Sequence, residues 1–223
     1  MIEAADLVIV GCGPAGATAA REAARAGRSV IVLEKDREVG QKRVCAAGLR
    51  PGFCRTFDLP ETIVHCDTPR LALFDADGKE HEIFFGPGHT TTREELDGTI
   101  ALLAQSEGAD IRTSSLFRDV QSDGDATLVE YATLDHPQRK RIRTRNVFFA
   151  QGATAKLESH GDFAFDGWEP GLMTTLQYRV YLSRPAVAIA YQTLELHYYR
   201  AADGRQIVAW MFPKRDHLAI GLG

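Results

Sequence analysis

The first forty residues alternate between apolar runs and a segment with helical periodicity. The apolar run 7–10 predicts a buried strand, and an alanine-rich segment with helical spacing follows it. A second apolar run, 29–33, predicts another strand that ends at Glu34. This order predicts a parallel strand–helix–strand unit over residues 6–34.

A glycine turn joins the first strand to the helix. Gly11 permits a tight turn, Gly13 lets the backbone approach a pyrophosphate, and Gly16 lets the helix pack closely on the strand. Phosphates would lie at the helix N-terminus, where free N–H groups favour negative charge. Glu34 follows Gly16 at about the ~20-residue separation expected of a carboxylate that accepts from a ribose hydroxyl. The pattern predicts a dinucleotide site; the alternatives are an ordinary glycine-containing helix start and a solvated Glu34.

After residue 40 the pattern stops resembling a simple nicotinamide dehydrogenase. Runs 70–74 and 82–85 predict a hairpin around Asp77-Gly78. Thr92 and Glu95 predict a capping box that opens a helix to about residue 107. A short strand at 110–113 should then rejoin the parallel sheet.

The remaining segments alternate as antiparallel strands do. Runs 116–121, 127–134 and 141–150 predict a meander, and runs 187–199, 206–212 and 217–222 predict a second sheet. We therefore expect an α/β chain with a Rossmann-like domain, made of a parallel sheet plus a β-meander, and an antiparallel-sheet substrate domain. The expected boundaries are 1–40 with 92–155, and 41–91 with 156–223. Two antiparallel interruptions of a nucleotide-binding fold favour FAD over free NAD.

Composition narrows the class further. The chain has 223 residues, 44% of them hydrophobic and 25% charged, with a net charge of -4. A negative net charge gives no strongly basic surface of the kind that binds nucleic acid. The apolar runs are shorter than the ~18 residues that span a bilayer. Met1 leads directly into the first strand, so we expect no signal peptide and a cytoplasmic protein. The four cysteines form no C-x-x-C pair, so we expect free thiols and no metal site.

Four segments carry a family resemblance. They are the glycine turn with Glu34-Lys35, the loop 42–49 (KRVCAAGL), Thr92-Arg93 with the later Gly108-Ala109, and the string 209–214 (AWMFPK). In order and spacing they resemble the geranylgeranyl reductase family, within the flavoproteins that include the aromatic hydroxylases. The string 209–214 is similar to the family's W-x-F-P signature and is the most specific of the four.

The resemblance implies a reaction and a set of site residues. NAD(P)H or another donor would reduce FAD, and the reduced flavin would reduce carbon–carbon double bonds of a polyprenyl group. Cys45 would be the catalytic residue beside the flavin, although a buried structural cysteine is the alternative. The implied cofactor-binding residues are Gly11, Gly13, Pro14, Ala15, Gly16, Glu34, Lys35, Arg43, Ala46, Ala47, Gly48, Arg93, Val120 and Gly152. Trp210, Phe212 and Pro213 would contact substrate, and Phe163, Phe165, Trp168, Met173 and Tyr178 would add to an apolar channel, unless these aromatics are sheet core.

The chain also departs from the family pattern. Ala46 and Ala47 stand where relatives usually have glycine, Val208 replaces a tyrosine, and Gln151 replaces an aspartate. Relatives continue beyond the position of Gly223, so we expect this to be the N-terminal part of a longer protein, truncated at its C-terminus. A flavin monooxygenase of the hydroxylase type and a catalytically incomplete flavoprotein fragment stay open as alternatives. The expected partner is an isoprenoid or lipid-linked substrate, which would bring the protein to a membrane surface peripherally.

Overall fold

The protein forms two compact units. The computed structural model describes residues 2–41, 44–83, 88–153 and 173–223. The first unit comprises residues 1–41 and 96–172, and the second comprises residues 42–95 and 173–223. Helix α3 (Arg93–Ser106) contributes its first residues to the second unit and the rest to the first. Among the described residues, no helix combines the length and the apolar character that crossing a membrane requires.

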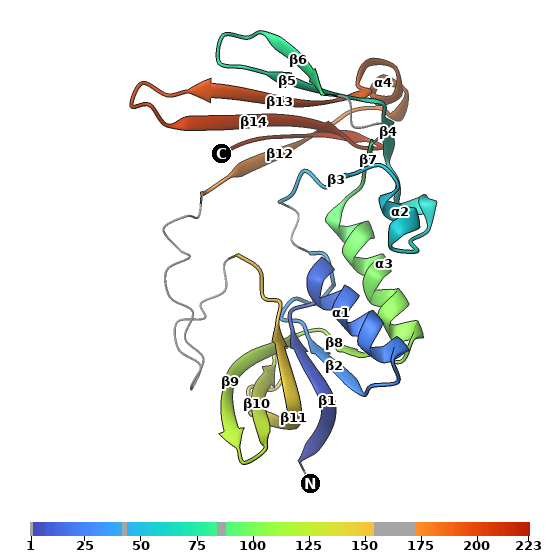
Figure 1. The fold of residues 1–223 in the computed structure, drawn as a ribbon, viewed down its shortest axis with the longest axis vertical. Coiled ribbons are helices and arrows are strands. Elements are labelled where there is room, and N and C mark those ends of the chain that lie inside the picture. The colour runs from blue at the N-terminus through green and yellow to red at the C-terminus, as the bar shows by residue number, and fades with distance from the viewer. Residues whose placement is uncertain (1, 42–43, 84–87, 154–172) are drawn as a thin grey trace. The chain divides into compact units, whose positions relative to one another are not determined.

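The first unit contains one six-stranded sheet (Figure 1). Its order is β8-β2-β1-β11-β10-β9, in which the first four strands run parallel and the last two complete an antiparallel meander. The bounds are β1 (Glu3–Val10), β2 (Val30–Leu33), β8 (Asp110–Arg112), β9 (Ser115–Asp123), β10 (Ala126–Thr133) and β11 (Lys140–Phe149). The predicted parallel sheet with a meander is confirmed.

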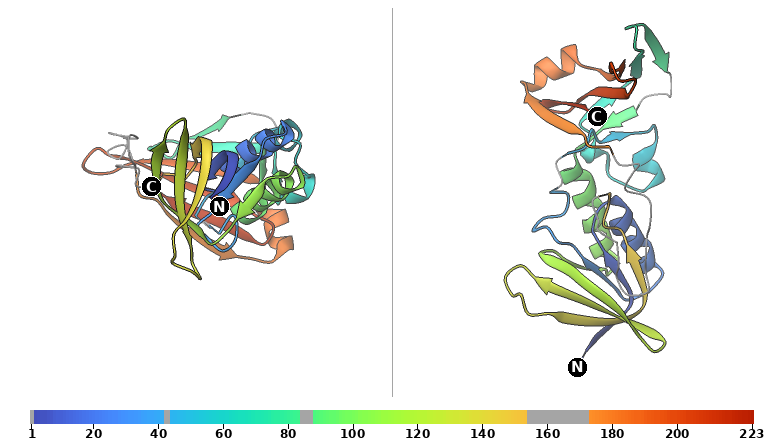
Figure 2. Two further views of the ribbon diagram at one scale, coloured as in Figure 1. Left: turned by 90° about the horizontal axis from the view of Figure 1, so that it is seen from below. Right: turned by 90° about the vertical axis from the view of Figure 1, so that its left-hand side faces the viewer.

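The core of this unit follows from the apolar runs. β2 is buried at all four positions, and β1 is buried only over its last three residues, Val8, Ile9 and Val10. Helix α1 (Pro14–Arg25) packs on β1 and β2, as Figure 2 shows, and its buried positions include Gly16, Ala17, Ala20 and Ala24. Small side chains let the helix approach the sheet closely, and the resulting burial of apolar surface stabilises the unit.

The second unit contains a six-stranded and a three-stranded sheet. Their orders are β12-β15-β14-β13-β5-β6 and β3-β7-β4. The large sheet is antiparallel, as predicted, except that β13 pairs with β5 in parallel. The strands are β3 (Gly48–Leu49), β4 (Cys66–Thr68), β5 (Arg70–Phe74), β6 (Glu80–Ile83), β7 (Gly88–Thr90), β12 (Leu176–Tyr181), β13 (Thr193–Arg200), β14 (Gln206–Pro213) and β15 (His217–Leu222). Two short helical turns, α2 (Phe53–Thr56) and a 3-10 turn (Glu61–Ile63), lie between β3 and β4.

The strand predicted over 187–199 is wrong in its first part. Residues Arg184–Ala190 form helix α4, and β13 starts only at Thr193. Ser183 caps this helix by accepting from the Ala186 amide at 3.4 Å, and a proline occupies its first turn. Val187 is 1% exposed. The Ser-x-Pro start and the buried Val187 outweigh the β-propensity of the valine and isoleucine that led to the strand prediction.

The predicted cap of α3 is present. Thr92 Oγ1 accepts from the Glu95 amide at 3.3 Å, as the first half of a capping box requires. The Glu95 carboxylate contacts Arg215 Nη1 at 3.3 Å and His65 Nε2 at 2.9 Å. Glu95 therefore ties the start of α3 to the turn after β14, a tertiary role that the local pattern does not reveal.

Close backbone packing in the first unit requires two of the predicted glycines. Gly11 has a φ of 99°, and a Cβ there would lie 2.5 Å from the Ala150 carbonyl oxygen. A Cβ on Gly16 would overlap the carbonyl oxygen of Gly11. The β1–α1 turn therefore cannot accept a side chain at either position without shifting the strand or the helix.

We expect Gly16→Ala and Gly98→Ala to change stability in opposite directions. Gly98 lies in α3 with no atom near an added Cβ, so alanine should stabilise the protein by about 1 kcal/mol through helix propensity. Gly16→Ala should destabilise it by about 1–3 kcal/mol through overpacking. Urea unfolding followed by circular dichroism measures both. Equal effects of the two substitutions would refute the proposed backbone constraint.

Candidate functional site

Three strand ends meet at one edge of the first unit's sheet. The Gly11 amide donates to the Leu33 carbonyl at 2.8 Å, and the Ala150 amide donates to the Val10 carbonyl at 2.8 Å. Because β1, β2 and β11 run parallel, their carboxyl ends share this edge, where ligands bind in open α/β sheets. The fold thus brings together the glycine turn, Glu34 and Gly152, which lie far apart in the sequence.

The N-terminus of α1 offers donors suited to an anion. Gly13 is the N-cap residue and supplies no side chain to cap the helix, and the first turn contains no acidic residue. The first amides of a helix lack intrahelical partners, and the helix dipole favours negative charge there. Pro14 is half-buried and Ala15 is exposed. These features fit a pyrophosphate, as predicted for the glycine turn.

Glu34 is fixed by backbone amides on both sides of its carboxylate. Oε2 accepts from the Cys12 amide at 2.7 Å, and Oε1 accepts from the Asp36 amide at 2.9 Å. A carboxylate has about four acceptor sites, so each oxygen can accept a further bond. The carboxylate is therefore held at the end of β2 in a fixed orientation, with capacity for a hydroxyl donor.

Cys12 behaves as a small buried filler in this turn. Its side chain is 1% exposed. Burial, together with the negative charges of Glu34 and Asp97, raises the pKa of the Cys12 thiol to about 12. A thiol so hard to ionise is a poor nucleophile, which leaves Cys12 a packing role.

Two further predicted cofactor residues, Lys35 next to Glu34 and Val120 in the meander, also belong to this unit. Lys35 has an exposed side chain that pairs with Asp36 Oδ1 at 2.7 Å. Val120 is 1% exposed within the sheet core. Val120 pairs with Val129 on β10, and Val129 pairs with Ile142 on β11. Ile142 in turn pairs with Glu3, at the end of β1 that is opposite Gly11. The fold therefore does not bring Val120 to the glycine turn.

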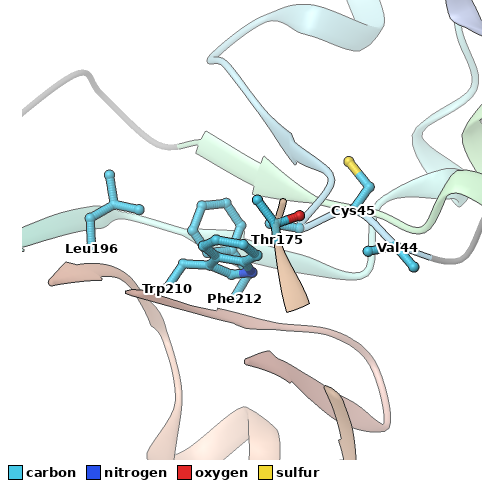
Figure 3. Close-up of a pocket in the computed structure, with 7 residues that line it drawn as sticks. Val44, Cys45, Thr175, Leu196, Trp210 and Phe212 are labelled. Atoms are coloured by element: carbon cyan, nitrogen blue, oxygen red, sulfur yellow. The ribbon is translucent and has the colours of Figure 1, made fainter. Parts of the chain in front are cut away.

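The second unit carries an apolar cavity of about 320 Å³ that is open to the surface. Its lining comes from the segment before β3, the segment before β12, and strands β13 and β14, as Figure 3 shows. The lining residues are Val44, Cys45, Ala46, Thr175, Leu196, Trp210 and Phe212. The structure thus brings Cys45, Trp210 and Phe212 together. Thr175 and Leu196 also line the cavity, and no local motif in the sequence marks them.

Two glycines make room for the aromatic rings of the cavity. A Cβ at Gly48 would lie 2.6 Å from Phe212 Cε2, and a Cβ at Gly221 would overlap the Trp210 ring. The Trp210 indole N–H donates to Gln177 Oε1 at 3.0 Å. Gly48, predicted as a cofactor residue, therefore also has a packing role against Phe212, and Gly221 and Gln177 were not predicted.

Among the residues that the structure describes, the other predicted substrate residues do not lie in the lining of this cavity. Pro213 ends β14, and its carbonyl accepts from Thr90 Oγ1 at 2.6 Å. Tyr178 is 64% exposed, and strand alternation places it on the face of the sheet opposite Trp210. Met173 is 60% exposed. Tyr178 therefore does not add to the wall that Trp210 forms; Phe163, Phe165 and Trp168 lie outside the described residues.

The loop that carries Cys45 has an unusual backbone. We call residues 44–47 the Cys45 loop. Ala47 has a φ of 45°, in the left-handed region that favours glycine. Its amide donates to Cys45 Sγ at 3.4 Å, and its carbonyl accepts from the Thr91 amide at 3.0 Å. An alanine thus adopts a backbone conformation that glycine adopts far more readily.

Two arginines are also among the predicted cofactor-binding residues. Arg93 begins α3 in the second unit and is half-buried. Arg43 lies outside the described residues. Both stay predictions.

Comparisons with known proteins agree with this architecture. A family model described as FAD dependent oxidoreductase matches residues 6–78. Digeranylgeranylglycerophospholipid reductase 2 of Methanothermobacter thermautotrophicus is 29% identical over 98% of this chain and 56% of its own length. Geranylgeranyl diphosphate reductase of Rhodobacter capsulatus is 25% identical over 98% of this chain and 54% of its own length. The chain therefore spans about half the length of these curated relatives.

Solved structures share the fold. A geranylgeranyl bacteriochlorophyll reductase-like protein of Thermoplasma acidophilum aligns with a TM-score of 0.77 at 21% identity, over 100% of this chain and 57% of its own. The p-nitrophenol 4-monooxygenase of Pseudomonas putida aligns with a TM-score of 0.76 at 17% identity, over 99% and 58%. Together with the sequence matches, these confirm the resemblance of this chain to the geranylgeranyl reductases, within a fold shared with FAD-dependent oxidoreductases.

Proposed function

We propose that the protein is an FAD-dependent oxidoreductase that reduces carbon–carbon double bonds of a polyprenyl group. The cavity beside Cys45 is the observation that carries this proposal. Five of its seven lining side chains are apolar, and the other two are a thiol and a threonine. A mostly apolar site with few polar groups suits an isoprenoid better than a charged or hydroxylated substrate. The sequence relatives named as geranylgeranyl reductases support the same substrate class.

The first unit would hold the cofactor. The N-terminus of α1 would bind the pyrophosphate, and the Glu34 carboxylate would accept from a ribose hydroxyl. Because Gly11 and Gly16 have no side chain, the turn stays tight enough for a pyrophosphate to approach the backbone. When bound, FAD supplies the hydride, after reduction by NAD(P)H or another donor.

Cys45 would supply the proton. An isolated alkene accepts a hydride poorly, so a proton must be added to the second carbon of the double bond. Cys45 is a lining residue of the cavity, and its thiol would donate that proton, which solvent then replaces. Trp210, Phe212 and Leu196 would orient the isoprene chain and exclude water. A lipid-linked substrate would also require peripheral contact with a membrane.

FAD binding is the first test of this assignment. We expect the purified chain to show a flavin spectrum after incubation with FAD and desalting. Glu34→Gln should weaken FAD binding by about tenfold or more, because a hydrogen bond to a charged group contributes about 1.5–3 kcal/mol. Glu38→Gln, at an exposed position four residues after Glu34, is the matched control. Flavin fluorescence titration measures the dissociation constants.

Two results would contradict the cofactor assignment. If Glu34→Gln bound FAD as tightly as the unaltered protein, the ribose role of Glu34 would be wrong. If the unaltered chain retained no FAD, the chain would be a catalytically incomplete flavoprotein fragment, the alternative that its partial coverage of its relatives keeps open.

Prenyl reduction is the second test. With FAD and NAD(P)H or dithionite, we expect a geranylgeranyl substrate to gain two hydrogens per reduced double bond, as measured by mass spectrometry. Cys45→Ala should lower kcat by about 10²-fold or more, the usual contribution of a positioned proton donor. Cys54→Ala is the control, because this buried thiol lies in α2 and does not line the cavity.

The fold also permits a competing outcome. The p-nitrophenol 4-monooxygenase shares this architecture, so a hydroxylase-type reaction is the second candidate. It would appear as NAD(P)H-driven oxygen consumption coupled to the gain of one oxygen atom by the substrate. Hydroxylation without double-bond reduction would overturn the proposed function.

A further inference from the structure

Lys214 is a buried lysine with an unusual set of partners. It is the first residue after β14, and it is 1% exposed. Its Nζ donates to the Ala46 carbonyl and, at 3.3 Å, to the Ala47 carbonyl. Over the described ranges no carboxylate lies within ion-pair distance of it. Burying an ammonium group without a counter-charge is costly, so this lysine is retained at the expense of stability.

Lys214 holds the same peptide group that contacts the catalytic thiol. The Ala46 carbonyl and the Ala47 amide belong to one peptide, which is planar and trans. Lys214 Nζ donates to the oxygen of this peptide, which is the Ala46 carbonyl. The N–H of the same peptide, which belongs to Ala47, donates to Cys45 Sγ at 3.4 Å. Because a rigid plane links the two ends, fixing the oxygen also fixes the direction of the N–H that orients the sulfur.

Gln177 holds the preceding peptide in the same way. Its Nε2 donates to the Cys45 carbonyl at 3.2 Å, while its Oε1 accepts from the Trp210 indole. Three successive carbonyls, those of Cys45, Ala46 and Ala47, are therefore bonded by side chains from the large sheet or the turn after β14. The left-handed backbone of Ala47 is strained for alanine, and such strain persists only where surrounding contacts impose it.

The same two residues also contact the walls of the cavity. Lys214 Nζ lies 5.9 Å from the centroid of the Phe212 ring, within reach of a cation–π interaction. Gln177 bonds Trp210 directly. Both aromatic rings line the cavity, so the loop and the substrate wall share their supports.

We propose that Lys214, assisted by Gln177, is a positioning residue that fixes the Cys45 loop and thereby sets the orientation of the Cys45 thiol at the cavity. The reaction that this serves rests on the proposed function, whereas the mechanical part of the proposal concerns only the described loop. Lys214 itself is not a lining residue of the cavity. It acts through the backbone of the loop.

Hydrogen exchange tests the mechanical part without substrate or cofactor. In Lys214→Met, which keeps most of the side-chain volume, we expect amides of residues 44–48 to exchange at least about tenfold faster, as local protection is lost. Amides of β13 and β14 should keep their protection. Lys79→Met, an exposed lysine at the β5–β6 turn, is the control and should leave the loop unchanged. Unchanged loop exchange in Lys214→Met would overturn the proposal.

Kinetics and stability separate positioning from simple structural support. In Lys214→Met we expect kcat for prenyl reduction to fall on the order of 10²-fold, because small misplacements have such effects. KM should change less than kcat, because Lys214 is not a lining residue of the cavity. A lowered melting temperature with an unchanged kcat would refute positioning. If the unaltered protein reduced no prenyl group, the proposed function would fail while the exchange result still decided the role of Lys214.

A pH series on the unaltered protein keeps the test decisive if Lys214→Met does not fold. Burial lowers the pKa of Lys214 to about 7. The nearby thiols of Cys45 and Cys66 act against this decrease, and the positive charge of Arg179 adds to it. His65 is another titratable group that faces Lys214. Loss of its charge weakens a charge-assisted bond. Loop exchange, corrected for its intrinsic pH dependence, should therefore accelerate as pH rises through 7, whereas Lys214→Gln should show no such step. Equal loop exchange in the unaltered protein and in Lys214→Gln at every pH would overturn the proposal.

The same titration predicts the sign of a stability change. In the unfolded chain Lys214 has its ordinary pKa of 10.5, so between pH 7 and 10.5 the unfolded state binds more protons than the folded state. Stability should therefore gain a favourable contribution as pH rises across this window. Below pH 7 that contribution is absent, because the folded protein then carries the buried charge. Urea unfolding should show this contribution in the unaltered protein and not in Lys214→Gln.

Discussion

Close approach of backbone to backbone at the end of β1 is the constraint on which the first unit depends. Gly11 and Gly16 leave no room for a methyl group, because a neighbouring carbonyl oxygen occupies the space at each position. Without that approach, α1 could not start where β1 ends and still pack on the sheet. The helix N-terminus, the Glu34 carboxylate and the end of β11 are consequently gathered at one edge. A single steric requirement thus produces both the packing of the unit and the shape of the corner where we propose that a pyrophosphate binds.

The second unit obeys a different constraint, which is the satisfaction of buried polar groups. The Cys45 loop contains carbonyls that burial would otherwise leave unpaired, and an unpaired buried carbonyl is costly. Gln177, Thr91 and Lys214 satisfy them. Using a buried ammonium for this purpose costs more than a neutral donor would. That excess cost is the reason to connect Lys214 with the chemistry of the loop rather than with stability alone.

Local sequence patterns were sufficient for most elements of the fold. The apolar runs and the glycine turn predicted β1, α1 and β2, and the meander and the hairpin at Asp77-Gly78 also matched. Prediction was wrong at residues 187–190, where a capped, proline-started turn outweighed β-propensity. It also did not anticipate the parallel pairing of β13 with β5, because strand partners far apart in sequence leave no local signal.

The sequence alone determined the glycine turn, the parallel sheet and the family resemblance, because each depends on residue types at short, fixed spacings. Only the tertiary structure decided which residues surround Cys45. Leu196, Thr175 and Gln177 reach the cavity or its supports through sheet register, and no spacing in the chain encodes that register locally. The role of Lys214 is likewise a tertiary property, because the physical significance of a lysine depends on its burial and on the carbonyls that surround it.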